Sequence, residues 1–335
     1  MDTVLIRGGG IAACCCTRLL RQGGIPLVVE RADRPRLPAI MVSRTAQKLL
    51  ADVFQKDDLF DGLHQIRRRI VLWGDDTKPV VVSHSALVVS EQVLLDRLQF
   101  EDAPGDFQQS GGFAWTILTS HPLPQSSVER SFGSRMATAF AIELKAGSDA
   151  GACWIESLND GWLFLLPVDS DNAWLLAVGG SAETLLARSR LVVEEIAHAT
   201  GPGGKFPCHP RIADPLGGVG WLVCGTAALG FDPICGDGVG HATREAILGS
   251  AVVRAAAEGA DVDAVIAHYQ TRLLAGFRKH LEVCHDLYQA GGSGLWWDQQ
   301  IEEIRRGLEW STHQLQESRP FRYRLNGFAL ETVGS

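Results

Sequence analysis

The sequence is poor in lysine, has no long apolar run and contains no Cys-x-x-Cys motif. Only six of its 31 basic residues are lysine, and acidic residues outnumber basic ones, so the 335-residue chain has a net charge of −8. Such a chain lacks the basic field that nucleic-acid binding requires. No run reaches the roughly 18 apolar residues of a membrane-spanning helix, and residues 1–7 lack the pattern of a signal peptide. We therefore expect no nucleic-acid partner, no membrane span and a cytoplasmic location.

The eight cysteines form neither a disulfide framework nor a zinc motif. Three of them are consecutive, Cys14 to Cys16, and no two are spaced as Cys-x-x-Cys. This pattern favours a reducing compartment. His280 and Cys284 lie four residues apart on a predicted helix and would share one face. Because no acidic third ligand is evident, we expect no metal site.

The first 31 residues are predicted to form a strand, a helix and a second strand, joined by the turn Gly8-x-Gly10-x-x-Ala13. Such a turn brings backbone N–H groups and a helix N-terminus close to a pyrophosphate. Ala13 is small enough for close helix–strand packing, and Glu30 ends the second strand, where it can accept hydrogen bonds from ribose hydroxyls. The pattern predicts a dinucleotide site without separating FAD from NAD. The alternative is a tight turn with an incidental Glu30.

A second glycine-rich turn connects a predicted strand at 221–224 to a long helix expected over 242–257. The N-terminus of that helix offers unpaired N–H groups and a partial positive charge. Such a site suits the anionic edge of a reduced flavin. The alternative is another tight strand–helix turn. The turn contains Asp232, Pro233, Gly236 and Gly238.

Together the two turns resemble those of FAD-dependent monooxygenases of the aromatic-hydroxylase type and their tryptophan-halogenase-like relatives. In that superfamily the first motif binds the ADP part of FAD, and a later Asp-Pro and Gly-x-Gly stretch binds the ribityl chain and flavin ring. The segment 161–167, GWLFLLP, resembles a Gly-Trp-x-Trp-x-Ile-Pro segment of the halogenase branch. The resemblance implies an ADP site at Gly8, Gly10, Ala13 and Glu30, and a flavin-ring site at Asp232, Pro233, Gly236 and Gly238.

The same resemblance and the alternating apolar pattern predict a mixed α/β fold. A Rossmann-like FAD-binding domain is interrupted by an antiparallel-sheet substrate domain and followed by a helical C-terminal region. We also predict helices over 43–54, 90–100 and 182–197 and a hairpin joining 70–73 to 80–83. The expected ranges are 1–66, 85–127 and 205–260 for the FAD-binding domain, 67–84 and 128–204 for the sheet domain, and 261–335 for the helical region.

Four aromatic residues stand at predicted strand positions: Trp154, Trp162, Phe164 and Trp174. We predict that they line a pocket for an aromatic substrate. The alternative is that they fill the core of the sheet. We assign no catalytic residue, because in flavin hydroxylation the protein mainly excludes water, orients the substrate and supplies hydrogen bonds.

These observations favour an FAD-dependent monooxygenase that acts on an aromatic or electron-rich group. The substrate is an aromatic small molecule or a peptide-borne tryptophan, as in quinone-cofactor maturation, and electrons come from NAD(P)H or a partner flavin reductase. One alternative is an FAD-dependent oxidase or reductase, or a halogenase-like enzyme. Another is a cofactor-free scaffold protein, which Thr226 and Leu118 favour because the resembled family has acidic motifs at those places.

Overall fold

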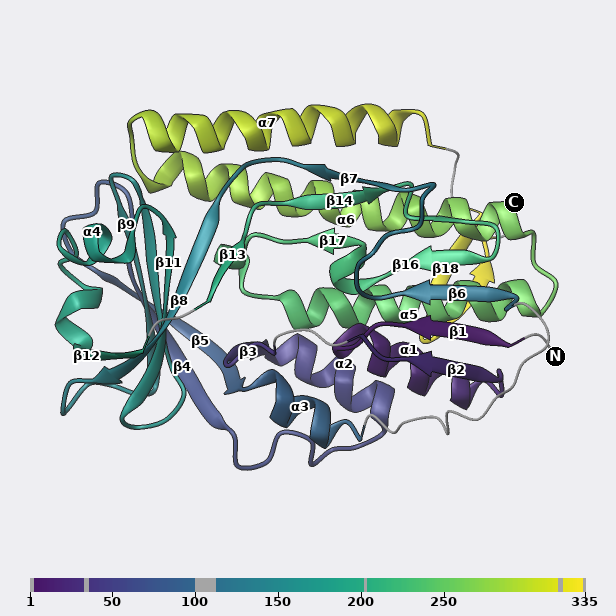
Figure 1. Cartoon of the computed structure of the whole chain (residues 1–335), viewed down its shortest axis with the longest axis horizontal. Helices are drawn as coiled ribbons and strands as arrows, with labels where there is room; N and C mark the ends of the chain where they lie inside the picture. Colours follow the sequence, from purple (N-terminus) through teal and green to yellow (C-terminus); the bar gives the residue numbers. More distant parts are fainter. Residues whose placement is uncertain (1–2, 33–35, 100–112, 202–203, 319–321, 334–335) are drawn as a thin grey trace.

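A computed structural model describes residues 3–32, 36–99, 113–201, 204–318 and 322–333. A nine-stranded sheet forms one end of the molecule and a five-stranded sheet with its helices forms the other (Figure 1). Both chain ends lie on the side away from the large sheet. Residues 33–35 and 100–112, which belong to the expected FAD-binding domain, lie outside the described residues.

The five-stranded sheet confirms the strand–helix–strand unit predicted at the start of the chain. Its order is β15-β16-β6-β1-β2, and all neighbouring strands are parallel except β15 and β16. Helix α1 (Ile11–Gln22) connects β1 to β2 and packs against α5 (Gly238–Ala257). The strands are β15 (Gly217–Gly218), β16 (Trp221–Val223), β6 (Trp115–Leu118), β1 (Val4–Arg7) and β2 (Leu27–Glu30).

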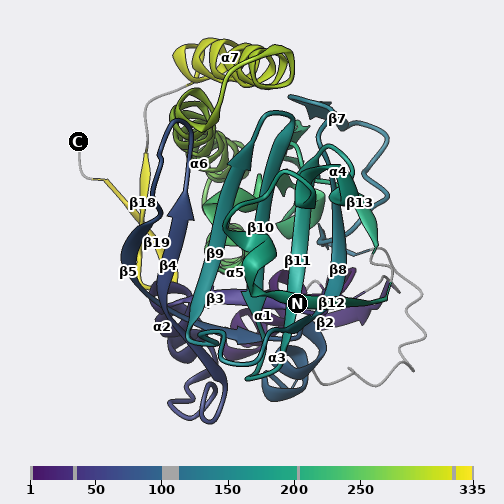
Figure 2. The same cartoon turned by 90° about the vertical axis from the view of Figure 1, so that its left-hand side faces the viewer.

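The nine-stranded sheet, seen face-on in Figure 2, is mixed rather than purely antiparallel, because β4 and β9 run parallel. Two of its strands, β3 and β13, come from ranges expected in the FAD-binding domain, and the domain boundaries themselves stay a prediction. In sheet order the strands are β12 (Ile196–Gly201), β8 (Met136–Leu144), β11 (Asn172–Gly179), β10 (Gly161–Pro167), β9 (Ala152–Leu158), β4 (His64–Leu72), β5 (Val80–Val89) and β3 (Ile40–Ser43), with β13 (Lys205–Pro207) paired to β8.

Smaller elements connect the two sheets. A three-stranded sheet consists of β17 (Leu229–Gly230), β14 (Arg211–Asp214) and β7 (Val128–Ser131). The short turns η2 (Gly225–Ala227) and η3 (Pro233–Cys235) lie between β16 and α5. A hairpin of β18 (Tyr323–Asn326) and β19 (Ala329–Thr332) packs against α5.

The helices largely follow the apolar periodicity of the sequence. Long α6 (Val262–Gly291) and α7 (Leu295–Gln316) form a pair along one side of the molecule (Figure 1). Helices α2 (Arg44–Phe54) and α3 (Glu91–Arg97) occur where predicted. Among the described residues, no helix is both long and apolar enough to cross a membrane.

The helix predicted over 182–197 is wrong. Helix α4 (Ala182–Leu186) is short, and the chain continues into η1 (Val192–Glu195) and then β12. The carboxylate of Glu156, on β9, accepts hydrogen bonds from the backbone N–H groups of Arg190, Leu191 and Val192. These bonds fix the chain in a non-helical path after α4.

The hydrophobic core lies mainly between the helices of the Rossmann-like unit and the inner face of the nine-stranded sheet. One large cluster joins α1, α5, α6 and the inner face of the nine-stranded sheet, with Tyr269, Phe277 and Trp297 fully buried in it. A separate cluster fills the outer face of that sheet, beneath α4 and η1. The architecture confirms the predicted fold class, a Rossmann-like unit interrupted by a sheet and followed by a helical region.

Candidate functional site

The first glycine turn lies where β1 ends and α1 begins. Gly8 and Gly10 have φ angles of +127° and +89°, which glycine adopts without strain. A Cβ atom on Gly8 would lie only 2.4 Å from Thr119 Oγ1, so glycine also permits the close approach of the segment that follows β6. Gly10 caps α1 without a side-chain hydrogen bond, and the first turn of the helix contains no acidic residue. The N–H groups at this helix start are therefore suited to an anion.

Two buried polar atoms beside the first turn have no hydrogen-bond partner among the described residues. They are Nη1 of Arg36 and Oγ of Ser120. A Cβ atom on Gly9 would lie 3.6 Å from Arg36 Nη1, and one on Gly8 would lie 2.6 Å from Ser120 Oγ. Leaving such groups unpaired is unfavourable. Both atoms are hydrogen-bond donors beside the turn, so these residues fit the pyrophosphate of a dinucleotide.

The second glycine turn lies against the first. Gly225 has a φ angle of +59°, and a Cβ atom on it would lie 2.7 Å from the Cβ of Ala12 in α1. Thr226 Oγ1 donates to the carbonyl of Thr119 at 3.2 Å, which ties this turn to the end of β6. Parallel strands therefore bring together turns from distant parts of the chain at their carboxyl ends, the usual ligand-binding edge of an α/β sheet.

Ala13 is buried behind the first turn, whereas Glu30 lies near the surface beside it. Ala13 is fully buried in α1. Glu30 ends β2 with its side chain half-exposed, and its carboxylate forms an ion pair with Arg7 at 2.9 Å. A ribose hydroxyl would therefore compete with Arg7 for this carboxylate.

Asp232 is buried and holds the second turn in place. Its carboxylate accepts hydrogen bonds from Arg135 Nε at 3.1 Å, from the Tyr288 hydroxyl at 2.8 Å and from the backbone N–H of Ile234 at 3.0 Å. Pro233 follows as the first residue of η3. Asp232 therefore positions the loop through Arg135, which directly precedes β8, through Tyr288 on α6 and through the loop itself.

Gly236 lies against the nine-stranded sheet, and Gly238 begins α5. Gly236 has a φ angle of +61°, and a Cβ atom on it would lie 3.0 Å from Met41 Cε and 3.3 Å from Arg69 Nη2. At Gly238 a Cβ atom would meet no atom within 4 Å. Asp237 between them binds Arg244 at 2.5 Å, so its negative charge is compensated.

The inner face of the large sheet carries two more unpartnered nitrogen atoms, which the sequence analysis did not identify. Arg69 Nε on β4 and His84 Nε2 on β5 are buried without a hydrogen-bond partner among the described residues. Burial, assisted by the positive charge of Arg69, lowers the pKa of His84, so its ring is neutral at pH 7. Their proximity depends on strand register, which no local motif reveals.

The four aromatic residues predicted to line a pocket lie on both faces of the large sheet. Trp162, Phe164 and Trp174 share the inner face, since Trp174 pairs with Leu166 on the neighbouring strand. Trp162 is fully buried and its Nε1 donates to the Tyr288 hydroxyl at 3.1 Å. Trp154 packs in the outer-face core instead. Three of the four therefore share one face of the sheet.

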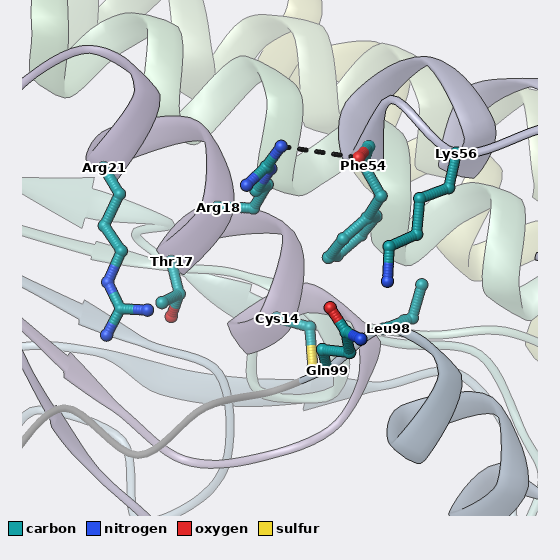
Figure 3. Close-up of a pocket in the computed structure, with 8 residues that line it drawn as sticks. All are labelled: Cys14, Thr17, Arg18, Arg21, Phe54, Lys56, Leu98 and Gln99. Atoms are coloured by element: carbon teal, nitrogen blue, oxygen red, sulfur yellow. Dashed lines mark hydrogen bonds between the residues drawn. The ribbon is translucent and has the colours of Figure 1, made fainter.

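A cavity of about 110 Å³ lies along α1, beyond the first turn (Figure 3). Arg18 donates to the carbonyl of Phe54 at 3.4 Å across its upper side. The cavity is separate from both glycine turns. Its lining is Cys14, Thr17, Arg18, Arg21, Phe54, Lys56, Leu98 and Gln99.

No protein-family model matches the chain, and no curated protein sequence matches it significantly. Solved structures do match. CmlS, a flavin-dependent halogenase, superposes with a TM-score of 0.72 at 16% identity, covering 97% of this chain and 74% of its own. The peptidyl tryptophan dihydroxylase QhpG, essential for tryptophylquinone cofactor biogenesis, gives a TM-score of 0.69 at 16% identity, with coverages of 99% and 86%.

HpxO from Klebsiella pneumoniae, solved in complex with FAD and uric acid, gives a TM-score of 0.62 at 16% identity. The match covers 95% of this chain and 93% of HpxO. These structural likenesses show that the chain has the fold of FAD-dependent halogenases and hydroxylases over nearly its whole length.

Proposed function

We propose that the chain binds FAD and is a monooxygenase that hydroxylates an aromatic or electron-rich group. The observation that carries this proposal is the meeting of the two glycine turns. Gly225 packs directly on Ala12 of α1, and the unpartnered atoms of Arg36 and Ser120 lie beside Gly9 and Gly8 of the first turn. The likeness to FAD-dependent hydroxylases and halogenases supports the choice of FAD over NAD.

The residues around the first turn would hold the ADP part of FAD. The N–H groups after Gly8 and Gly10 and the Arg36 guanidinium would bind the pyrophosphate, and Glu30 would accept from the ribose. In the second turn, Gly236 packs against Met41 and Arg69 of the large sheet and the space beside Gly238 is open, so the flavin ring would bind beside Gly238. When bound, FAD supplies the electrons that activate molecular oxygen.

The substrate would lie between the second turn and the inner face of the large sheet. That face offers apolar contacts from Phe164 and Met41 and hydrogen-bonding groups from Arg69 and His84. Such a mixture suits a flat, apolar ring with polar substituents. As a finer proposal, supported by the likeness to QhpG, the substrate is a tryptophan within a peptide.

We place the enzyme in the cytoplasm, because its eight cysteines are free thiols.

The FAD part of the proposal is tested by absorbance spectroscopy of the purified protein. We expect the two visible bands of oxidised flavin to persist through gel filtration, or to appear on the protein after incubation with FAD. A protein that takes up no FAD under either condition is a cofactor-free scaffold, and the proposal is then wrong.

The reaction is tested separately with the FAD-loaded protein. Tryptophan-containing peptides, and matched peptides with leucine in place of tryptophan, are incubated with oxygen and either NADPH alone or NADH with a flavin reductase. We expect mass spectrometry to show added oxygen only on the tryptophan peptides. Chloride incorporation would identify a halogenase instead, and reduced-cofactor consumption without oxygen transfer to any substrate class would favour an oxidase or reductase.

A further inference from the structure

Two cysteines and a histidine meet directly behind the second glycine turn. Cys235 Sγ, at the end of η3, lies 3.8 Å from Cys284 Sγ on α6. Cys284 Sγ lies 3.3 Å from His280 Nε2, one helical turn earlier. The three atoms all lie within 4.8 Å of one another. The shared helical face of His280 and Cys284 follows from their spacing, but Cys235 is 49 positions from Cys284, so spacing along the chain does not reveal it.

The surroundings favour thiol chemistry over metal binding. The backbone N–H of Asp232 donates to His280 Nε2 at 2.9 Å and thereby occupies the lone pair that a metal ion would need. All eight cysteines lie in the described part of the chain. Seven are buried, and Cys235 alone is partly exposed. An oxidant in solution therefore reaches Cys235 first, because Cys284 is buried.

We propose that Cys235 and Cys284 are a reversible dithiol–disulfide pair that peroxide oxidises and low-molecular-weight thiols reduce. Their sulfur atoms are already in van der Waals contact at 3.8 Å, and bond formation shortens this distance to about 2.05 Å. The disulfide would connect the loop that begins at Asp232 to helix α6. This inference does not depend on FAD binding.

Electrostatics supports the order of the steps. The thiol of Cys284 donates to Cys235, and His280 adds to this effect, so the pKa of Cys235 is lowered to about 6. The same contact, together with burial, raises the pKa of Cys284. The lowered pKa favours the thiolate form of Cys235, which is the reactive form.

The oxidation balances with hydrogen peroxide as the only oxidant. The Cys235 thiolate attacks one peroxide oxygen, the O–O bond breaks, and a sulfenic acid forms as hydroxide leaves and takes a proton to become water. Cys284 then releases its proton and attacks the Cys235 sulfur. The S–S bond forms, the S–O bond breaks, and the departing hydroxide takes that proton to give a second water. Two thiols lose two electrons in total.

The test is mass spectrometry of the intact protein before and after one equivalent of hydrogen peroxide. We expect a loss of two hydrogen masses, a fall of two in alkylatable thiols, and full reversal by dithiothreitol. Non-reducing tryptic digestion is expected to yield one cross-linked pair, which joins the peptides 212–244 and 280–305. Fragmentation of this pair locates the bond at Cys235 rather than at Cys224.

Variants make the test specific. Cys235→Ser and Cys284→Ser are each expected to abolish the cross-link, whereas Cys153→Ser is expected to retain it. Cys153 is a matched control because it is a buried thiol on β9, and burial raises its pKa to about 11. Accumulation of sulfinic acid on Cys235 without a cross-link would overturn the proposal. So would one equivalent of zinc or copper in the isolated protein that protects both thiols from alkylation.

Discussion

Four buried side chains fix the loop that begins at Asp232. Arg135 and Asp232 form a fully buried ion pair, Tyr288 donates to the same carboxylate, and Trp162 donates to Tyr288. The Arg135 guanidinium also lies 4.7 Å from the centre of the Tyr288 ring. These groups come from β10, α6, the loop and the residue just before β8, so the network joins the large sheet to the candidate flavin site.

Replacing Arg135 with methionine tests the importance of that network for stability. The variant leaves the Asp232 carboxylate buried without its cationic partner, which is expected to lower the free energy of unfolding by about 3–5 kcal/mol. Urea unfolding followed by tryptophan fluorescence measures the loss. Arg130→Met is the matched control, since Arg130 pairs with Asp214 near the surface and its loss is expected to cost less than about 1 kcal/mol. Equal losses of stability in the two variants would contradict a special role for the buried Arg135–Asp232 pair.

Glu245 gives the protein a specific dependence of stability on pH. The side chain is buried in α5 and accepts from the N–H of Gly225 at 2.8 Å. Burial raises its pKa from 4.5 to about 8. Between these values the unfolded chain releases the proton that the folded chain keeps, so this residue lowers stability as pH rises from about 4.5 to about 8.

Glu245→Gln removes this titration and keeps an oxygen for the Gly225 N–H. We expect the variant to be less sensitive to pH over that range, with its greatest gain over the wild type above pH 8. Thermal unfolding at a series of pH values is the measurement. If the difference between variant and wild type did not change with pH, Glu245 would not have a raised pKa.

At the scale of secondary structure, the sequence indicates an element well where the cause is local. The glycines at 8, 10 and 225 predict turns because their backbone angles require glycine, and the apolar spacing in α1 predicts its helix. The interval 182–197 shows where prediction from local sequence fails. Its leucines and valines have helical spacing, but Glu156, distant in sequence, binds the backbone at 190–192 and ends the helix early.

The contact between the two glycine turns is tested by Gly225→Ala. The added methyl group would lie 2.7 Å from Ala12 Cβ at a positive φ angle, so we expect a loss of about 1–3 kcal/mol in stability. The control is Gly276→Ala in α6, where a Cβ atom meets nothing within 4 Å and helix propensity predicts a gain of about 0.5–1 kcal/mol. A neutral Gly225→Ala variant would show that the turns do not pack as described.

At the scale of the whole molecule, the chain makes one site from segments far apart in sequence. The motifs predict which turns take part, and the structure shows that they meet. The unpartnered atoms of Arg36, Ser120, Arg69 and His84 follow from strand register and loop packing. These properties arise only when the sheets are assembled, so no single stretch of sequence indicates them.

The central claim is that the two turns form one FAD site, and a fluorescence titration of FAD against three proteins tests it most directly. We expect the wild type and Arg188→Met, a control on the large-sheet side of the molecule where Arg188 pairs with Asp160, to bind FAD alike. Arg36→Met removes the unpaired guanidinium at the first turn and is expected to weaken binding about 10- to 100-fold, since a hydrogen bond to a charged group contributes about 1.5–3 kcal/mol. Equal affinity in all three proteins, or no binding by the wild type, would contradict the account.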